Sequence, residues 1–68
     1  MTKAEIKEEL EKYAGSPFIN ISKLAKCLHI RTEYAADICK NLDRIESGRE
    51  KRYYTGDVAR ELIRRRVI

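Results

Sequence analysis

Apolar residues recur at helical spacing near the start of the chain. Ile6, Leu10 and Tyr13 lie four and three positions apart between lysines and glutamates. This spacing predicts an amphipathic helix over about residues 3–14. Thr2-Lys3-Ala4-Glu5 has the Ser/Thr-x-x-Glu form of a capping box, which favours a helix start there. The narrow apolar stripe and the excess of acidic residues indicate a structural helix that covers a core from one side.

The next apolar pattern predicts a helix-turn-helix over about residues 22–42. Ser22 is placed to cap its first helix, and Thr32 is placed to cap its second, which is expected from Glu33 to Leu42. Apolar positions share one face of each helix, and in chain order they are Leu24, Ala25, Leu28, Ala35, Ile38, Cys39 and Leu42. Two short helices joined by about four residues are typical of this DNA-binding motif.

The pattern changes to strand formers after Arg44. Ile45 and Tyr53-Tyr54 favour strands, and Ser47-Gly48-Arg49-Glu50 between them is typical of a turn in which glycine takes a positive φ. A hairpin over about residues 44–54 is therefore predicted. Because successive strand residues face opposite sides, one of the two tyrosines is expected in the core.

A final helix is expected over about residues 56–66. Thr55-Gly56-Asp57 supplies capping groups at its start. The expected inward residues are Val58 and Leu62, with Ala59 and Ile63 as further candidates, and the expected outward residues are Arg60, Arg64, Arg65 and Arg66. The order helix, helix, helix, hairpin, helix predicts a mainly α fold with a small β-hairpin, a winged helix-turn-helix whose hairpin is the wing.

Composition bounds the class of protein. A chain of 68 residues has material for a single domain, expected over residues 1–68, and its 43% hydrophobic and 38% charged residues are typical of a globular protein. Apolar runs are far shorter than the ~20 residues of a membrane span. Two cysteines without an apolar signal segment do not make a disulfide framework, so a cytoplasmic location is expected.

The net charge of +4 is distributed unevenly along the chain. Residues 1–16 carry a net charge of −1 and residues 17–43 carry +1. The remaining residues hold eight basic against four acidic side chains, so the whole excess lies toward the C-terminal end. A basic end on a domain of pI about 9.3 favours a polyanion as partner.

Hydrogen-bond donors on the helix-turn-helix and the wing are the candidate DNA-binding residues. Cationic groups at the hairpin tip suit successive phosphates, helix side chains suit phosphates or base edges, and a helix N-terminus offers free N–H groups to an anion. The candidates are Ser22, Lys23, Arg31, Thr32, Tyr34, Lys40, Asn41, Arg49, Lys51 and Arg52. Capping alone explains Ser22 equally well, and a solvated wing is the competing interpretation of the hairpin cations.

Catalytic and metal chemistry find little support in the chain. Cys27 and Cys39 are twelve positions apart with a single histidine, His29, nearby. This spacing lacks the Cys-x-x-Cys clustering of a structural zinc site, so both thiols are expected to be packing residues. Glycine-rich phosphate loops and nucleophile elbows are also missing from the sequence, and we expect a non-enzymatic protein without a cofactor.

Two segments resemble a known family. Ile21-Ser22-Lys23-Leu24-Ala25-Lys26-Cys27-Leu28-His29-Ile30 resembles the opening helix of the MerR-type winged-helix superfamily, and Arg52-Tyr53-Tyr54-Thr55-Gly56-Asp57-Val58 resembles its wing exit and following helix. Small phage and transposon excisionases share that plan. The resemblance covers roughly residues 18–66 and implies a DNA-binding module whose second short helix lies in the major groove and whose wing touches the flanking backbone. Many relatives act in transcription or direct site-specific recombination.

The sequence departs from that pattern at three places. His29 occupies a turn position where such proteins usually carry glycine, and the extra N-terminal helix without a long dimerising helix does not fit the dimeric activators. Glu33 and Asp37 lie on the outward face of the predicted recognition helix, where phosphates would repel them unless they accept hydrogen bonds from cytosine.

The expected function is therefore binding of double-stranded DNA, by a transcriptional regulator or an excisionase-like architectural factor of a mobile element. Expected partners are the DNA and, for added affinity, a second copy on tandem sites or a recombinase; neither a membrane nor a small-molecule ligand is expected. The alternative is a winged-helix protein–protein adaptor, in which Glu33 and Asp37 would be contacts. An RNA-binding role is a weaker third possibility, because aromatic residues for base stacking are few. The sequence leaves open the DNA site, the direction of regulation and the oligomeric state.

Overall fold

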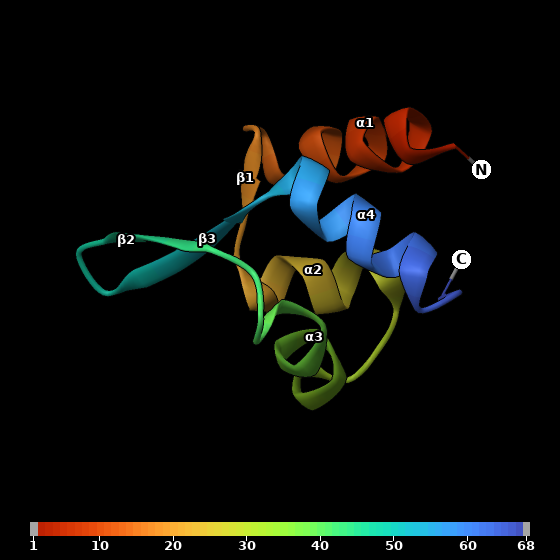
Figure 1. Cartoon of the computed structure of the whole chain (residues 1–68). Helices are drawn as coiled ribbons and strands as arrows, with labels where there is room; N and C mark the ends of the chain where they lie inside the picture. The colour runs from red at the N-terminus through yellow and green to blue at the C-terminus, as the bar shows by residue number, and fades with distance from the viewer. Residues whose placement is uncertain (1, 68) are drawn as a thin grey trace.

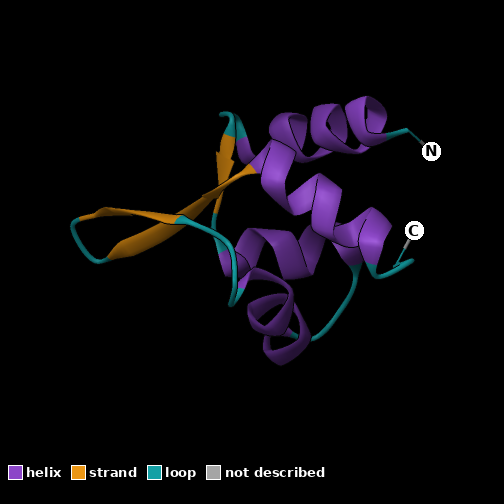
Figure 2. Cartoon of the chain, in the orientation of Figure 1, coloured by secondary structure: helices purple, strands orange, loops and turns teal. Residues whose placement is uncertain are grey.

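The computed structural model describes residues 2–67 and has four helices and a three-stranded sheet (Figure 1). In chain order the elements are α1 (Lys3–Ala14), β1 (Phe18–Ile19), α2 (Ile21–Leu28), α3 (Thr32–Cys39), β2 (Arg44–Ser47), β3 (Glu50–Tyr54) and α4 (Thr55–Arg64). Figure 2 shows the helices gathered on one side and the β2–β3 hairpin projecting from them as the wing. The predicted mainly α fold with a small hairpin is confirmed.

Helix α1 begins and ends as predicted. Its capping box is complete, because the Thr2 hydroxyl accepts from the Glu5 N–H at 3.2 Å and the Glu5 carboxylate accepts from the Thr2 N–H at 3.0 Å. Gly15 ends the helix in the left-handed region with φ 72°. The expectation that Tyr13 faces the core is wrong, since its side chain is 48% exposed. The buried stripe continues four residues after Leu10, at the half-buried Ala14.

Both predicted caps of the helix-turn-helix are wrong. Helix α2 is capped by Asn20, whose side-chain oxygen accepts from the Lys23 N–H at 2.8 Å, and Ser22 lies inside the helix. Because β1 leads directly into α2, the single residue between them takes the cap position. The cap residue of α3 is Arg31, which makes no side-chain cap hydrogen bond, and Thr32 is the first helical residue.

The turn after α2 is made by His29. This residue lies in the left-handed region, with φ 56° and ψ 44°. Its N–H donates to the Lys26 carbonyl at 3.3 Å, and the Ile30 N–H donates to the Ala25 carbonyl at 3.0 Å. These two bonds form a Schellman motif, the usual setting for glycine. His29 therefore keeps the backbone conformation that glycine takes at such a turn.

The wing belongs to a sheet that is larger than the predicted hairpin. The strand order is β1-β3-β2, all antiparallel, and the short strand β1 was not predicted. Phe18 pairs with Tyr54 and Ile19 with Tyr53. Tyr53 is 5% exposed and Tyr54 41%, which confirms that one tyrosine packs in the core. Gly48 lies in the hairpin turn with φ 64°, as expected.

Helix α4 begins one residue earlier than expected and ends at Arg64 rather than residue 66. The expected capping role of Thr55 is wrong: its buried hydroxyl donates to the Glu11 carboxylate of α1 at 3.3 Å, and no side chain caps the helix. Ile63 is 41% exposed, so its expected inward placement is wrong as well. Helix α4 is thereby tied to α1 by a polar bond as well as by its apolar face.

One apolar core joins all four helices to the sheet. Helix α3 contributes to it with fewer residues than expected, because it ends at Cys39 and leaves Leu42 half-buried outside the helix. The buried hydrophobic residues are Ile6, Leu10, Ile19, Leu24, Ala25, Ala35, Ile38, Cys39, Tyr53, Val58, Ala59 and Leu62. This core holds α3 and the wing in fixed positions on one body.

Candidate nucleic-acid interface

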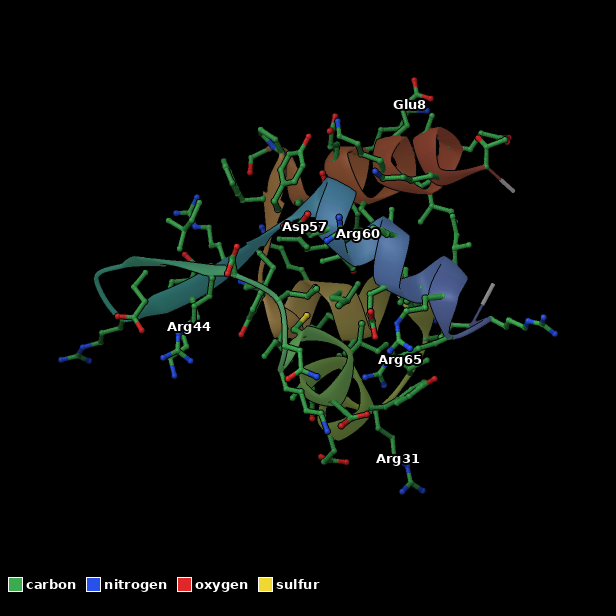
Figure 3. The ribbon with its side chains drawn as sticks, viewed as in Figure 1. Glu8, Arg31, Arg44, Asp57, Arg60 and Arg65 are labelled. Atoms are coloured by element: carbon green, nitrogen blue, oxygen red, sulfur yellow. The ribbon has the colours of Figure 1, made fainter. Side chains whose placement is uncertain are left out.

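The start of α3 presents several of the predicted contact residues to solvent. Arg31, Thr32 and Tyr34 are exposed, and Figure 3 shows the Arg31 side chain extending away from the body. The Thr32 hydroxyl donates to the Glu33 carboxylate at 3.1 Å. Since the Arg31 side chain makes no cap hydrogen bond, the first-turn N–H groups of α3 have no side-chain acceptor there.

The end of α3 is held by an ion-pair network with α4. The Asp37 carboxylate lies 3.1 Å from the Lys40 ammonium and 2.7 Å from the Arg65 guanidinium. Arg65 also donates to the Asp37 carbonyl at 3.1 Å and to the Glu61 carboxylate at 2.6 Å. Hydrogen bonds from Arg65, and then from Lys40, hold the pKa of Asp37 below its ordinary value.

This network corrects the expected outward placement of Arg65. Its side chain is only 18% exposed, and Figure 3 shows it between α4 and α3. Asp37 is paired with two cations, so its negative charge would repel phosphates less than its sequence position suggests. Of the other two predicted contacts here, Lys40 is exposed but shares Asp37, and Asn41 is exposed just after the helix.

Strand pairing divides the predicted wing cations between two faces. Arg44 lies opposite Tyr53 and Glu46 opposite Lys51, and directly opposed residues share a face. Arg44 and Lys51 therefore lie on the face that carries Tyr53 into the core. Arg49 is exposed in the turn at the tip of the wing.

Arg52 lies on the opposite face of the wing, beside α2. It lines a hollow of about 150 Å³ together with Lys23, Asn20 and Glu50. The Asn20 amide donates to the Glu50 carboxylate at 2.6 Å, and the Arg52 Nε lies 3.4 Å from the same carboxylate. Both neighbours, Asn20 first, lower the pKa of Glu50. Two predicted contacts, Lys23 and Arg52, are thus brought together around the Glu50 carboxylate.

A second, open hollow brings Ser22 and Thr32 together. It has a volume of about 490 Å³ and lies between the end of α1, the outer side of α2 and the start of α3. Lys26 and His29 also line it, and the exposed ring of Tyr13 forms part of its wall. Ser22 therefore lies beside cationic and hydroxyl groups although it does not cap α2.

The basic residues differ in whether they form an ion pair with a carboxylate. Of the fifteen lysines and arginines, eight form ion pairs within residues 2–67. The other seven, which we call the unpaired cations, are Lys3, Lys23, Lys26, Arg31, Arg49, Lys51 and Arg66. Five of these seven lie on α2, at the start of α3 and on the wing. The available positive charge is concentrated on the helix-turn-helix and the wing.

Two exposed basic residues of this surface were not predicted as contacts. Lys26 is unpaired on α2, and Arg44 begins β2 with its guanidinium 3.3 Å from Glu46. Figure 3 shows Arg44 and Arg31 extending toward the same side of the molecule, from the wing and from α3. The sequence alone does not identify Arg44 as a contact residue, because the register of the hairpin decides which face of the wing Arg44 lies on.

The cysteines are packing residues, as expected. Cys39 is buried, and burial raises the pKa of its thiol to about 11; burial also raises the pKa of Cys27. Neither forms a disulfide. Within residues 2–67, no group of three or more His, Cys, Asp or Glu side chains is placed to hold a metal ion.

In the same part of the chain, no helix combines the length and the apolar character that crossing a bilayer needs. Comparisons with protein-family models, curated proteins and solved structures find no match for this chain.

Proposed function

We propose that this chain binds double-stranded DNA without catalysing a reaction, with α3 in the major groove and the wing on the flanking backbone. The observation that carries the proposal is the location of the unpaired cations. Five of the seven lie on the helix-turn-helix and the wing, whereas most cations of α1 and α4 are neutralised by neighbouring carboxylates. Cations without acidic partners can neutralise phosphates, and so release counterions from the DNA, without first giving up an ion pair.

The start of α3 supports the same proposal. Arg31 and Thr32 are exposed at a helix start whose cap residue leaves the N–H groups free, a setting that favours phosphate. Tyr34, 40% exposed, adds a hydroxyl donor in the same first turn. These groups suit the backbone and the base edges at the entrance of a major groove about 12 Å wide.

The proposed interface is small, so a single copy needs a further source of affinity. A single module of this kind buries about 600–1,000 Å² against DNA and reads few base pairs. Added affinity would come from tandem sites, from a second copy or from a recombinase, each of which raises the effective concentration. A transcriptional regulator and an excisionase-like architectural factor of a mobile element both fit this requirement.

The test is a titration of a fluorescent random-sequence duplex at several salt concentrations. With about five phosphate contacts, we expect the log of the affinity to fall against log salt with a slope near −4.5. Arg49→Ala/Lys51→Ala removes two unpaired wing cations and should flatten the slope by about two. The matched control is Arg60→Ala/Arg64→Ala, which removes the same charge from α4, where both arginines are paired.

Each outcome decides between specific alternatives. Absence of binding at low salt would reject the DNA proposal and favour the protein–protein adaptor, for which the exposed Glu33 would be a contact. Equal effects of the wing and α4 variants would keep DNA as the ligand but remove the wing from the interface. Preferential competition by single-stranded RNA would replace duplex DNA with RNA.

A further inference from the structure

Arg65 occupies an unusual position for an arginine near the end of a basic helix. Its side chain is 18% exposed, and each of its three guanidinium nitrogens has an acceptor. The Nε donates to Glu61 at 2.6 Å, one terminal nitrogen donates to the Asp37 carboxylate at 2.7 Å, and the other donates to the Asp37 carbonyl at 3.1 Å. Bidentate and multidentate arrangements of this kind fix a guanidinium in place. Three of the five N–H donors of Arg65 are thereby used within the chain, and every guanidinium nitrogen already has a partner.

Asp37 is the acidic group that this arrangement neutralises on the proposed DNA-reading helix. Its two carboxylate oxygens are divided between two cations: one pairs with Arg65 from α4, and the other pairs with Lys40 of the same stretch of chain. Lys40 is 60% exposed at its side chain, so it can exchange Asp37 for a phosphate, whereas the half-buried Arg65 stays with Asp37.

From this geometry we infer that Arg65 sustains DNA affinity by neutralising Asp37, without touching DNA itself; the inference rests on the proposed function. With Arg65 in place, Lys40 can leave Asp37 for the DNA backbone while the Asp37 carboxylate stays paired. Without Arg65, Lys40 is the only cation among residues 2–67 within ion-pair distance of Asp37, so either Lys40 stays there or a negative charge faces the phosphates.

The inference is tested by a cycle of variants in the duplex titration. Arg65→Ala should weaken binding by about fivefold, the effect of one unscreened like charge at a distance of several ångströms. Asp37→Asn/Arg65→Ala should return the affinity to within about twofold of the wild type, because the variant carries neither charge. Arg60→Ala is the matched control; Figure 3 shows Arg60 beside Asp57 near the start of α4, away from α3, and its removal should change the affinity little.

The cycle separates charge neutralisation from two other roles of Arg65. If Arg65 touches a phosphate, or if its bonds act by fixing the position of α3, Arg65→Ala weakens binding as much in the Asp37→Asn background as in the wild type, because those bonds are lost in both; charge neutralisation predicts a smaller loss in the Asp37→Asn background. Equal losses in the two backgrounds overturn the inference and leave the proposed function standing, provided that the wild type binds the duplex. A wild type that does not bind rejects the proposed function itself, and the inference with it.

Asp37→Asn alone keeps the inference falsifiable if removal of Arg65 unfolds the chain. The amide oxygen of asparagine still accepts from Arg65, so the bond between α3 and α4 is retained in neutral form. We expect tighter duplex binding and a steeper salt dependence than in the wild type, because Lys40 is released from its carboxylate partner. Unchanged or weaker binding by this variant would overturn the inference.

Discussion

The wing and the C-terminal segment carry the same number of basic residues but use them differently. Residues 44–54 and residues 55–67 each contain four. In the C-terminal segment, Arg60, Arg64 and Arg65 are paired with carboxylates three or four positions earlier on the same helix. In the wing, Arg49 and Lys51 form no ion pair within the described part of the chain.

The difference follows from the period of each element. Residues three and four apart meet on a helix surface, so alternating arginines and carboxylates neutralise one another there. In a strand, successive residues face opposite sides, and only residues two apart or directly opposed share a face. Charge composition alone therefore does not locate a polyanion site; the secondary structure decides which charges remain available.

The largest expected contrast between the two regions concerns stability. Leu62 of α4 is fully buried, and Leu62→Ala should lower the free energy of unfolding by about 2–5 kcal/mol. Ile45 of the wing is 49% exposed, and Ile45→Ala should change it by less than about 0.5 kcal/mol. Urea denaturation followed by circular dichroism measures both. Comparable losses would contradict the view of α4 as a structural element and of the wing as an appendage.

The second contrast is a dependence of stability on pH that belongs to the α4 network. Hydrogen bonds from Arg64 and Arg65 lower the pKa of Glu61 from 4.5 to about 2. A lowered pKa stabilises the folded state above the ordinary value, and this contribution is lost as the pH falls through the folded value. The stability advantage of the wild type over Glu61→Gln should thus shrink between about pH 4.5 and pH 2.

The same denaturation series includes a control from the wing. Glu46 forms only an exposed pair with Arg44, and such pairs contribute little, so Glu46→Gln should have a small effect throughout this range. A constant difference between the wild type and Glu61→Gln would show that the network does not store this pH-dependent stability.

The third contrast concerns the wing turn. Gly48 has φ 64°, and a Cβ atom there would meet nothing within 4 Å. The cost of Gly48→Ala is therefore conformational, about 1 kcal/mol, because L residues are strained in the left-handed region. Amide hydrogen exchange would report faster opening of β2 and β3 with little change in α4. Uniformly faster exchange would mean that the wing unfolds only together with the body.

The smallest expected effect has the opposite sign and lies after α4. Arg66 takes φ 57° in a Schellman motif, in which the Val67 N–H donates to the Leu62 carbonyl at 3.0 Å. Arg66→Gly should relieve strain and raise the free energy of unfolding by about 0.5 kcal/mol, the relief being partly offset by the greater freedom of glycine in the unfolded chain. His29→Gly, in the same motif after α2, should act in the same direction. Destabilisation by both would show that the two side chains stabilise their turns by contacts.

The local signals were strong enough to predict most elements. The capping box of α1, the strand-forming tyrosines and the apolar spacing of α2 and α3 each depend on residues within a few positions of one another. Caps were predicted less well: Asn20 was missed because its role follows from the strand before it, and Thr55 turned out to bond to Glu11, 44 positions away.

The candidate site was predictable by residue type but not by arrangement. All the predicted contacts except Arg52 are exposed, as a surface role requires. Their grouping depended on pairings that no local pattern contains, such as the register that places Lys51 on the same face of the wing as Arg44. The tie between Arg65 and Asp37 spans 28 positions and depends on the packing of α4 against α3.

The sequence by itself determined the types and order of the helices and the hairpin, and the excess of basic residues toward its C-terminal end. Those properties arise from short-range periodicity and composition. Most ion pairs join residues two to four positions apart and follow from the secondary structure. Only the tertiary structure decided that Arg65 also neutralises Asp37 and which wing residues lie opposite one another, because these depend on helix packing and on strand register. Arg65 and Lys51 differ for this reason: packing against α3 adds Asp37 to the Glu61 partner that Arg65 has on its own helix, whereas the wing leaves Lys51 exposed and without an ion pair in the described part of the chain.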